Sequence, residues 1–203
     1  MVQEPQAPAR RQSDEAPIPS ADSGRVTLRP ATSADEHAFV ELVSASADLH
    51  GPWMSLAATP EKFQAYLTRY ERPGEESLLV CLRDSGAIAG LVNINSIIRG
   101  RFQSASVSYA AFAPTAGRGY MTEGLGLAVR YAFEELRLHR LEANIQPGNQ
   151  ASLNLVRRLG FGREGYSADM LFIDGAWRDH ERWAITTAMT GTAAEPHASL
   201  PAR

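Results

Sequence analysis

The chain is predicted to fold as a single α+β domain built around one mixed sheet, and two observations lead to that prediction. Strand-like and helix-like segments follow one another in the order βαα, βββ, α, β, α, ββ across the 203 residues, without an internal repeat. Hydrophobic residues make up 44% of the chain and charged residues 21%, as in an ordinary globular domain. A chain of this length has room for one such domain and two tails.

The two ends of the chain differ in composition from the middle. Residues 1–24 hold four of the twelve prolines, mixed charges and few large aliphatic side chains. Such a segment buries too little apolar surface to offset its loss of conformational entropy, so we expect a disordered N-terminal tail. Residues 191–203 have the same character and are predicted to form a disordered C-terminal tail. The folded domain is therefore predicted at residues 25–190.

The domain is expected to begin with one strand and two helices. The strand is expected at residues 25–29 and the first helix at residues 32–47, where Ser33 and Glu36 have the spacing of a capping box. The second helix is expected at residues 59–70, because a threonine and then a proline precede an apolar stripe with helical spacing.

The rest of the domain is expected to supply the remaining strands and two more helices. Runs of apolar and β-branched residues predict strands at residues 77–84, 87–98, 105–113, 141–145, 161–172 and 176–188. Apolar residues with helical spacing predict helices at residues 122–137 and 149–160. The last two strands are expected to pair as a hairpin around the sequence IDG, which brings the sheet to six or seven strands.

Charge and composition exclude several classes of protein. The net charge of −3 provides no overall electrostatic attraction to nucleic acid or to an anionic membrane. No apolar run reaches the length of a transmembrane helix, and the N-terminus lacks the layout of a signal peptide. The single cysteine, Cys81, has no partner for an internal disulfide, and no His or Cys cluster has metal-ligand spacing. We therefore expect a cytoplasmic protein without a metal site.

A glycine-rich stretch, AGRGYMTEG at residues 116–124, lies between a predicted strand and a predicted helix. The first amides of a helix have no intrahelical partner, and the helix dipole makes that end partly positive. Gly117 and Gly119 allow these N–H groups to converge and an anion to approach without a Cβ in the way. The pattern favours a phosphate or pyrophosphate ligand, although a tight turn without a ligand has the same pattern.

Two common phosphate-binding loops do not match this stretch. A P-loop requires Gly-Lys followed by Ser or Thr, whereas Tyr120 follows Gly119 here. The dinucleotide fingerprint requires glycine at the position of Thr122, and no parallel βαβ series surrounds it. A different phosphate-bearing ligand is therefore expected.

Two separated motifs resemble one family. Residues 117–123, GRGYMTE, resemble the acyl-CoA pyrophosphate loop of the Gcn5-related N-acetyltransferases, the GNAT superfamily. Residues 149–152, NQAS, with LGF at 159–161 and EG at 164–165, resemble the signature of the branch that acetylates ribosomal-protein N-termini. The sequences LRP at the first strand and HGPW before the second helix are similar to the same branch.

The resemblance implies the GNAT fold, in which about four helices flank a mostly antiparallel sheet that splays into a V. The V is implied between residues 107–113 and residues 141–145, with acetyl-CoA as the co-substrate bound in it. The residues implied to pair with the pantetheine arm through their backbone are Ala111, Phe112 and Ala113. The residues implied to hold the pyrophosphate are Gly117, Arg118, Gly119, Tyr120, Met121 and Thr122.

The resemblance also implies which residues take part in the reaction. Asn149 would hydrogen-bond to the pantetheine arm, although its position equally fits the N-cap of the following helix. Ser152 would lie near the sulfur and protonate the leaving thiolate, directly or through a water. Glu142 is the candidate base that deprotonates the amine, with an ion pair to Arg140 as the alternative.

Four further residues are candidates for the acceptor pocket. His50 and Trp53 are expected to form its wall, although packing of the tryptophan between two helices is the alternative. Asn93 and Asn95 alternate on one face of their strand and are expected to form a polar floor. Arg157 and Arg158, in contrast, are expected to face solvent, with contact to the CoA phosphates as the alternative.

The function implied is transfer of an acetyl group from acetyl-CoA to a primary amine by direct attack, with the N-terminal α-amine of a protein as one acceptor. Two alternatives stay open. The first is an acetyltransferase of a small-molecule amine such as an amino acid, a polyamine or an antibiotic. The second is a non-catalytic acyl-CoA-binding module. The expected partners are acetyl-CoA and the amine, without nucleic acid or membrane, in a monomer or homodimer.

Overall fold

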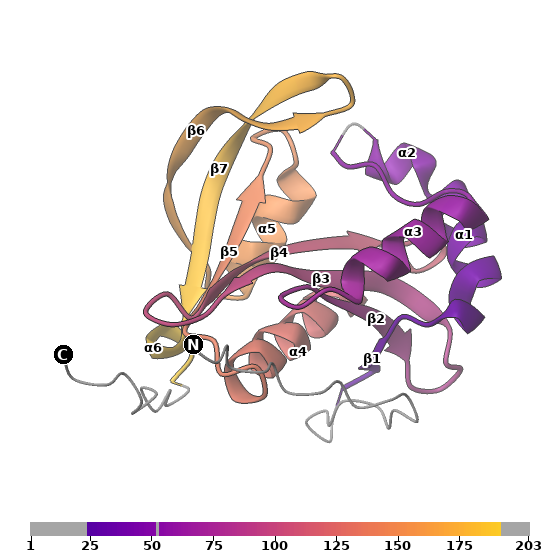
Figure 1. The fold of residues 1–203 in the computed structure, drawn as a ribbon, viewed down its shortest axis with the longest axis horizontal. Coiled ribbons are helices and arrows are strands. Elements are labelled where there is room, and N and C mark those ends of the chain that lie inside the picture. Colours follow the sequence, from indigo (N-terminus) through magenta and orange to yellow (C-terminus); the bar gives the residue numbers. More distant parts are fainter. Residues whose placement is uncertain (1–23, 52, 192–203) are drawn as a thin grey trace, which may run out of the picture.

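The structure, a computed structural model, describes residues 24–51 and 53–191. Apart from Gly24 and Gly191, the two predicted tails lie outside the described residues. One seven-stranded sheet runs through the described part of the chain in the order β1-β2-β3-β4-β5-β7-β6 (Figure 1). The mixed α+β fold expected from the sequence is confirmed.

Every neighbouring pair of strands is antiparallel except β4 and β5, which are parallel. The strands are β1 Val26–Pro30, β2 Glu76–Leu82, β3 Ile88–Ile98, β4 Ser104–Ala111, β5 Arg140–Ile145, β6 Gly162–Ile173 and β7 Ala176–Thr186. The helices are η1 Ser33–Asp35, α1 Glu36–Ala45, α2 Ala47–His50, α3 Pro60–Tyr70, η2 Ala113–Thr115, α4 Tyr120–Glu134, α5 Gln150–Arg158 and α6 Thr187–Thr190. Among the described residues, no helix has the length and hydrophobicity needed to cross a bilayer.

Two hydrophobic clusters lie on opposite faces of the sheet. Helices α1 and α3 cover one face through a cluster that includes Phe39, Phe63 and Phe112, each 0% exposed (Figure 1). Helices α4 and α5 pack on the other face through a larger cluster that includes Leu125 and Leu153. The sheet is therefore buried between helices on both sides for most of its width.

The first helical segment begins differently from the prediction. The N-cap is Thr32 rather than Ser33, and the acid of the capping interaction is Asp35 rather than Glu36. The Asp35 carboxylate accepts the Thr32 N–H at 2.8 Å, and Arg29 of β1 donates to the same carboxylate at 2.8 Å. The prediction was one residue late because the tertiary partner of the acid, an arginine on the neighbouring strand, cannot be read from helix spacing.

The predicted splay is confirmed. Strands β4 and β5 pair only where residues 104–106 face residues 140–142. Beyond Ser106, β4 pairs only with β3, while β5 pairs along its whole length with β7. The sheet therefore opens into a V whose two arms are the second half of β4 and the second half of β5.

Candidate active site

Two adjoining cavities open where β4 and β5 separate. The larger cavity, of about 420 Å³, lies between α2, the end of β4, the first turn of α4 and one side of α5. The smaller cavity, of about 180 Å³, lies between β4, β5 and the β6–β7 hairpin. The residues that line both cavities are Trp53, Met54, Tyr109, Asn149 and Ser152.

The start of α4 forms one end of the larger cavity. Gly117 and Gly119 have φ angles of +77° and +83°, in the left-handed region that favours glycine. Gly119 is the N-cap of the helix, and the N–H groups of Thr122 and Glu123 donate to its carbonyl at 3.0 and 3.3 Å. The N–H groups that precede Thr122 have no intrahelical acceptor, so this end of the cavity is suited to an anion.

The third glycine of the stretch has a different purpose. A Cβ on Gly124 would lie 2.6 Å from Val80 Cγ2, so the helix backbone packs directly on β2 at this point. The interpretation that the glycines of residues 116–124 serve phosphate binding therefore does not extend to Gly124.

Arginines around this helix terminus are arranged differently from the expectation. Arg158 lines the larger cavity instead of facing solvent alone. Arg118 does not appear among the described residues that line it, although its carbonyl accepts from Arg25 Nη2 at 3.1 Å. Arg25 also donates to Glu123 Oε1 at 2.7 Å and lies 4.7 Å above the ring of Tyr120. The sequence did not predict this contact, because Arg25 precedes β1 and is 98 residues away from Glu123 in the chain.

The backbone at the end of β4 is only partly free. The Phe112 N–H donates to Ala89 of β3 at 3.0 Å, and the Ala113 N–H donates to Ser46 Oγ at 2.8 Å. Because ladder hydrogen bonds alternate in an antiparallel pair, the Ala111 backbone faces away from β3 and into the V. Its carbonyl accepts from His50 Nε2 at 2.8 Å. The expectation that all three residues present unpaired backbone groups therefore differs from the structure.

His50 and Trp53 do not share one environment. His50 is 6% exposed, lines only the larger cavity and holds the end of β4 through Ala111. Trp53 lines both cavities, and its carbonyl accepts from Gln146 Nε2 at 3.2 Å. Trp53 therefore stands at the junction of the two cavities, whereas His50 borders only the larger one. The role of Trp53 as a wall of the acceptor pocket stays a prediction.

Tyr109 and Ser152 meet at the junction of the two cavities. The Tyr109 hydroxyl lies 2.6 Å from Ser152 Oγ, which joins the splayed part of β4 to the first turn of α5. Burial raises the pKa of Tyr109 to about 12, and the hydrogen bond with Ser152 opposes part of that rise. The phenol therefore stays protonated at neutral pH. Asn149 Oδ1 accepts the Ser152 N–H at 3.1 Å, so the N-cap alternative for Asn149 is present in the structure.

Glu142 adopts the alternative that the sequence left open. Arg140 Nε donates to Glu142 Oε1 at 2.9 Å, and Arg140 Nη1 donates to Glu164 Oε1 at 2.7 Å. Among the described residues that line the two cavities, Glu142 does not appear. The structure therefore places this carboxylate in a surface ion-pair network rather than in the V.

Asn93 and Asn95 lie beneath α3 instead of forming a pocket floor. The Tyr66 hydroxyl donates to Asn93 Oδ1 at 2.8 Å, and the Tyr70 hydroxyl donates to Asn95 Oδ1 at 2.8 Å. Asn95 Nδ2 donates to Ser108 Oγ at 3.2 Å. The alternation that we interpreted as a pocket floor instead satisfies buried polar groups between helix and sheet.

The β6–β7 hairpin forms the outer wall of the smaller cavity. Leu171, Ile173 and His180 from this hairpin line it, and Figure 1 shows the hairpin bending toward the segment that follows α2. Its turn is closed by Asp174 and Gly175, both with positive φ, as in the Asp-Gly hairpin turn. Ser55 Oγ donates to Asp174 Oδ1 at 2.5 Å, so the hairpin end is held against the segment that follows α2.

The fold agrees with a comparison against known protein families. The family model described as acetyltransferase (GNAT) domain matches residues 25–162, and the chain belongs to that family. The GNAT family uses acetyl-CoA. A solved structure of similar fold is Mycobacterium smegmatis RimJ in complex with CoA-disulfide, with a TM-score of 0.76 and 26% identity over 83% of this chain and 85% of that chain.

Two characterised relatives differ in the amine named for them. The chain is 41% identical over 104 residues to the ribosomal protein uS5-alanine N-acetyltransferase of Escherichia coli (strain K12). The aligned residues make up 51% of this chain and 54% of that protein. The match thus spans about half the length of that relative. The chain is 28% identical over 171 residues to the spermidine N(1)-acetyltransferase of the same strain, covering 83% and 88%.

Proposed function

We propose that this protein transfers the acetyl group of acetyl-CoA to a primary amine, and that the acceptor is the N-terminal α-amine of a polypeptide. The observation that carries the proposal is the Tyr109–Ser152 hydroxyl pair at the junction of the two cavities. One cavity leads from this pair to a glycine-capped helix terminus, and the other leads from it to the hairpin wall.

The residues of the larger cavity fit an acyl-CoA. Gly117, Gly119 and the first amides of α4 offer N–H donors to a pyrophosphate, and Arg158 brings a positive charge to the same cavity. We expect the Ala111 N–H, which faces the V, to donate to an amide carbonyl of the pantetheine arm, since the Ala111 carbonyl already accepts from His50. Acetyl-CoA, when bound, supplies an acetyl thioester to the junction.

The hydroxyl pair has a clear chemical use at that junction. A phenol with a pKa of about 12 stays neutral and keeps its proton available for hydrogen bonding. Tyr109 and Ser152 together donate a hydrogen bond to the sulfur as negative charge develops on it, which lowers the free energy of the transition state. Asn149, which caps α5, keeps Ser152 in place.

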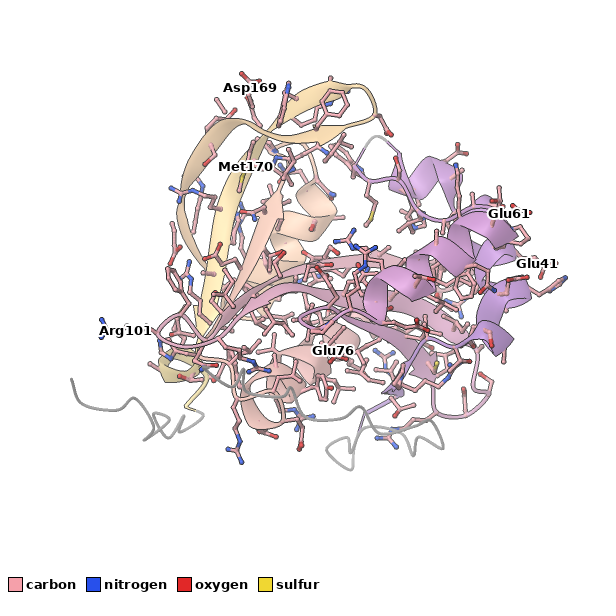
Figure 2. The ribbon with its side chains drawn as sticks, viewed as in Figure 1. Glu41, Glu61, Glu76, Arg101, Asp169 and Met170 are labelled. Carbon is pink, nitrogen blue, oxygen red and sulfur yellow. The ribbon has the colours of Figure 1, made fainter. Side chains whose placement is uncertain are left out.

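The chemistry of the smaller cavity favours a monoamine over a polyamine. A polyamine carries several ammonium groups, and their burial requires carboxylate partners. Among the described residues that line the smaller cavity, none is Asp or Glu. Figure 2 shows Glu41 and Glu61 on α1 and α3 at the opposite edge of the molecule from the hairpin. An α-amine is also deprotonated more easily than a lysine amine, with a pKa of about 8 against about 10.4.

The test is release of free thiol from acetyl-CoA by the purified protein with a panel of acceptors. The panel contains peptides with N-terminal Ala or Ser, the same peptides with a blocked N-terminus, spermidine, free amino acids and an aminoglycoside. We expect release with the free N-terminal peptides and a loss of rate in Ser152→Ala. Thiol release only with spermidine or another small amine would show that the acceptor is a small molecule and not a polypeptide N-terminus.

A second measurement separates transfer from binding alone. Titration calorimetry of the same preparation with acetyl-CoA reports whether the larger cavity binds the co-substrate. Binding without thiol release from any acceptor would favour the non-catalytic acyl-CoA-binding module. Absence of binding would contradict the proposal as a whole.

A further inference from the structure

We propose that His180 removes the proton from the acceptor ammonium, and that Asn144 beside it receives a hydrogen bond from the amine. This inference rests on the proposed function and deepens it, since it assigns the base that Glu142 is not placed to provide. The residues come from β7 and β5, the two strands that form the arm of the V opposite β4.

His180 is buried yet borders the smaller cavity. It is 2% exposed and lies on β7 among the residues that line that cavity. Asn144 of β5 lies opposite Arg182 of β7, so alternation along the strands places His180 on the same face as Asn144. Among the described residues that line the smaller cavity, His180 is the one with a basic side-chain nitrogen, and histidine is the side chain that acts most often as a general base.

The hydrogen bond of the imidazole determines which nitrogen is basic. His180 Nδ1 lies 2.9 Å from the Arg178 carbonyl oxygen, which can only accept, so Nδ1 carries the hydrogen. In the neutral ring Nε2 is then the unprotonated nitrogen. Within the described part of the chain, Nε2 makes no hydrogen bond. It is also not one of the fully buried nitrogen or oxygen atoms that lack a partner, so part of its surface is accessible. Nε2 is therefore free to accept a proton from the cavity.

The other polar feature of this wall is an acceptor without a partner. Asn144 Oδ1 is buried and makes no hydrogen bond to any described residue. A buried amide oxygen without a partner costs free energy unless a ligand or a water supplies a donor. The Asn144 side chain lines the smaller cavity, so a rotation of its amide would expose this oxygen to an N–H donor of an amine that enters there and would orient the nitrogen toward the junction.

Charged groups surround His180 without competing for the cavity. On its own strand, Asp179 and Glu181 project to the opposite face, where Asp179 accepts the Asp169 N–H at 2.9 Å and Glu181 accepts from Arg163 at 3.0 Å. The charged neighbours on its own face are Arg178 and Arg182. The neutral groups from β4, β5 and α5 that share the cavity are Ser108, Tyr109, Asn144, Gln146, Asn149 and Ser152.

The protons of the reaction then balance. The ammonium of the acceptor carries three protons: His180 Nε2 takes one and passes it to solvent, and one stays on the amide product. The third accompanies the sulfur, beside Tyr109 and Ser152, as the carbon–nitrogen bond forms and the carbon–sulfur bond breaks. Each turnover therefore releases one free thiol and one proton.

The experiment compares His180→Asn with the wild-type protein, since the asparagine Nδ2 can still donate to the Arg178 carbonyl while the basic nitrogen is lost. The rate of thiol release with an N-terminal peptide is measured from pH 6 to 9.5. We expect kcat/KM at pH 7 to fall about 100-fold, the lower range for general-base catalysis. The loss should shrink as the pH passes the acceptor pKa of about 8, where the free amine forms without help.

Two controls make the result specific. His139→Asn changes a histidine whose Nδ1 also makes a hydrogen bond, at 3.0 Å to Thr187, but which lies outside both cavities, and it should leave the profile unchanged. The affinity for acetyl-CoA, measured by calorimetry, should be unchanged in His180→Asn. His180→Gln should show the same loss of rate and the same unchanged affinity as His180→Asn.

The outcomes separate this inference from the proposed function. A wild-type protein that transfers acetyl groups, with a His180→Asn variant of equal rate and pH profile, would overturn the assignment of His180 alone. A wild-type protein that binds acetyl-CoA but acetylates no amine would overturn the proposed function, and the assignment with it. An Asn144→Leu variant should raise KM for the acceptor, and an unchanged KM would remove Asn144 from the assignment.

Discussion

At the scale of single residues, the Tyr109 hydroxyl joins β4 to α5 at the junction of the two cavities, because it lies 2.6 Å from Ser152 Oγ. Tyr109→Phe removes this hydroxyl and leaves the ring in place. We expect kcat for thiol release to fall about 100-fold, as for loss of one donor to a developing charge. The affinity for acetyl-CoA, measured by calorimetry, should change little.

The same pair can be tested for shared action. If both hydroxyls serve one sulfur, the effects of Tyr109→Phe and Ser152→Ala should not add, and the double variant should resemble the worse single variant. Additive losses would mean that the two hydroxyls act independently, and a fully active Tyr109→Phe would contradict the proposed use of the pair.

At the scale of elements, the N-terminus of α4 depends on a left-handed glycine. Gly119→Ala places a Cβ on a residue with φ of +83° and should destabilise the fold by about 1 to 2 kcal/mol. Gly86→Ala is a matched control, since Gly86 has φ of +72° in the turn between β2 and β3, far along the chain from α4. Both should lower stability to urea, but only Gly119→Ala should weaken acetyl-CoA binding by calorimetry.

Helix α4 also contains two glycines that should respond in opposite directions to alanine. At Gly124 a Cβ would lie 2.6 Å from Val80 Cγ2, and we expect overpacking to destabilise the fold by about 1 to 3 kcal/mol. At Gly126 a Cβ would lie 3.5 Å from Leu159 Cδ2, an ordinary contact, so helix propensity should stabilise by about 0.5 to 1 kcal/mol. Urea unfolding measures both, and partial recovery in Gly124→Ala with Val80→Ala would identify the clash as the cause.

At the scale of the whole molecule, buried tyrosines should make the fold sensitive to alkali. Burial raises the pKa of Tyr66 and of Tyr109 to about 12, against about 10 in an unfolded chain. The unfolded state therefore loses these protons first, and stability present below pH 10 should decline as the pH rises through 12. At pH 11 each tyrosine should account for a decline on the order of 1 kcal/mol.

Urea unfolding at pH 8 and pH 11 tests this expectation, with Tyr66→Phe as the informative variant. The variant loses the hydrogen bonds of Tyr66 to Ser77 and Asn93 and should be less stable at pH 8. Its further loss between pH 8 and pH 11 should nevertheless be smaller than that of the wild-type protein. An equal loss would show that other groups determine the alkaline limit.

The sequence by itself determined those features that depend on neighbours along the chain. Local spacing and backbone preference predict the strands and the helix that begins with Thr59 and Pro60. They also predict the cap at Asn149 and the glycines at 117 and 119. These preferences act over a few residues, so a single chain carries enough information to predict them.

Only the tertiary structure decided which polar side chains face the V. Tyr109 and His180 are 71 residues apart in the sequence, and they line one cavity because the sheet splays and the hairpin bends over it. The same packing turned Asn93 toward α3 and Glu142 toward Arg140. Alternation along a strand predicts two faces, but which of them meets a helix, an ion pair or a cavity depends on the elements that cover it.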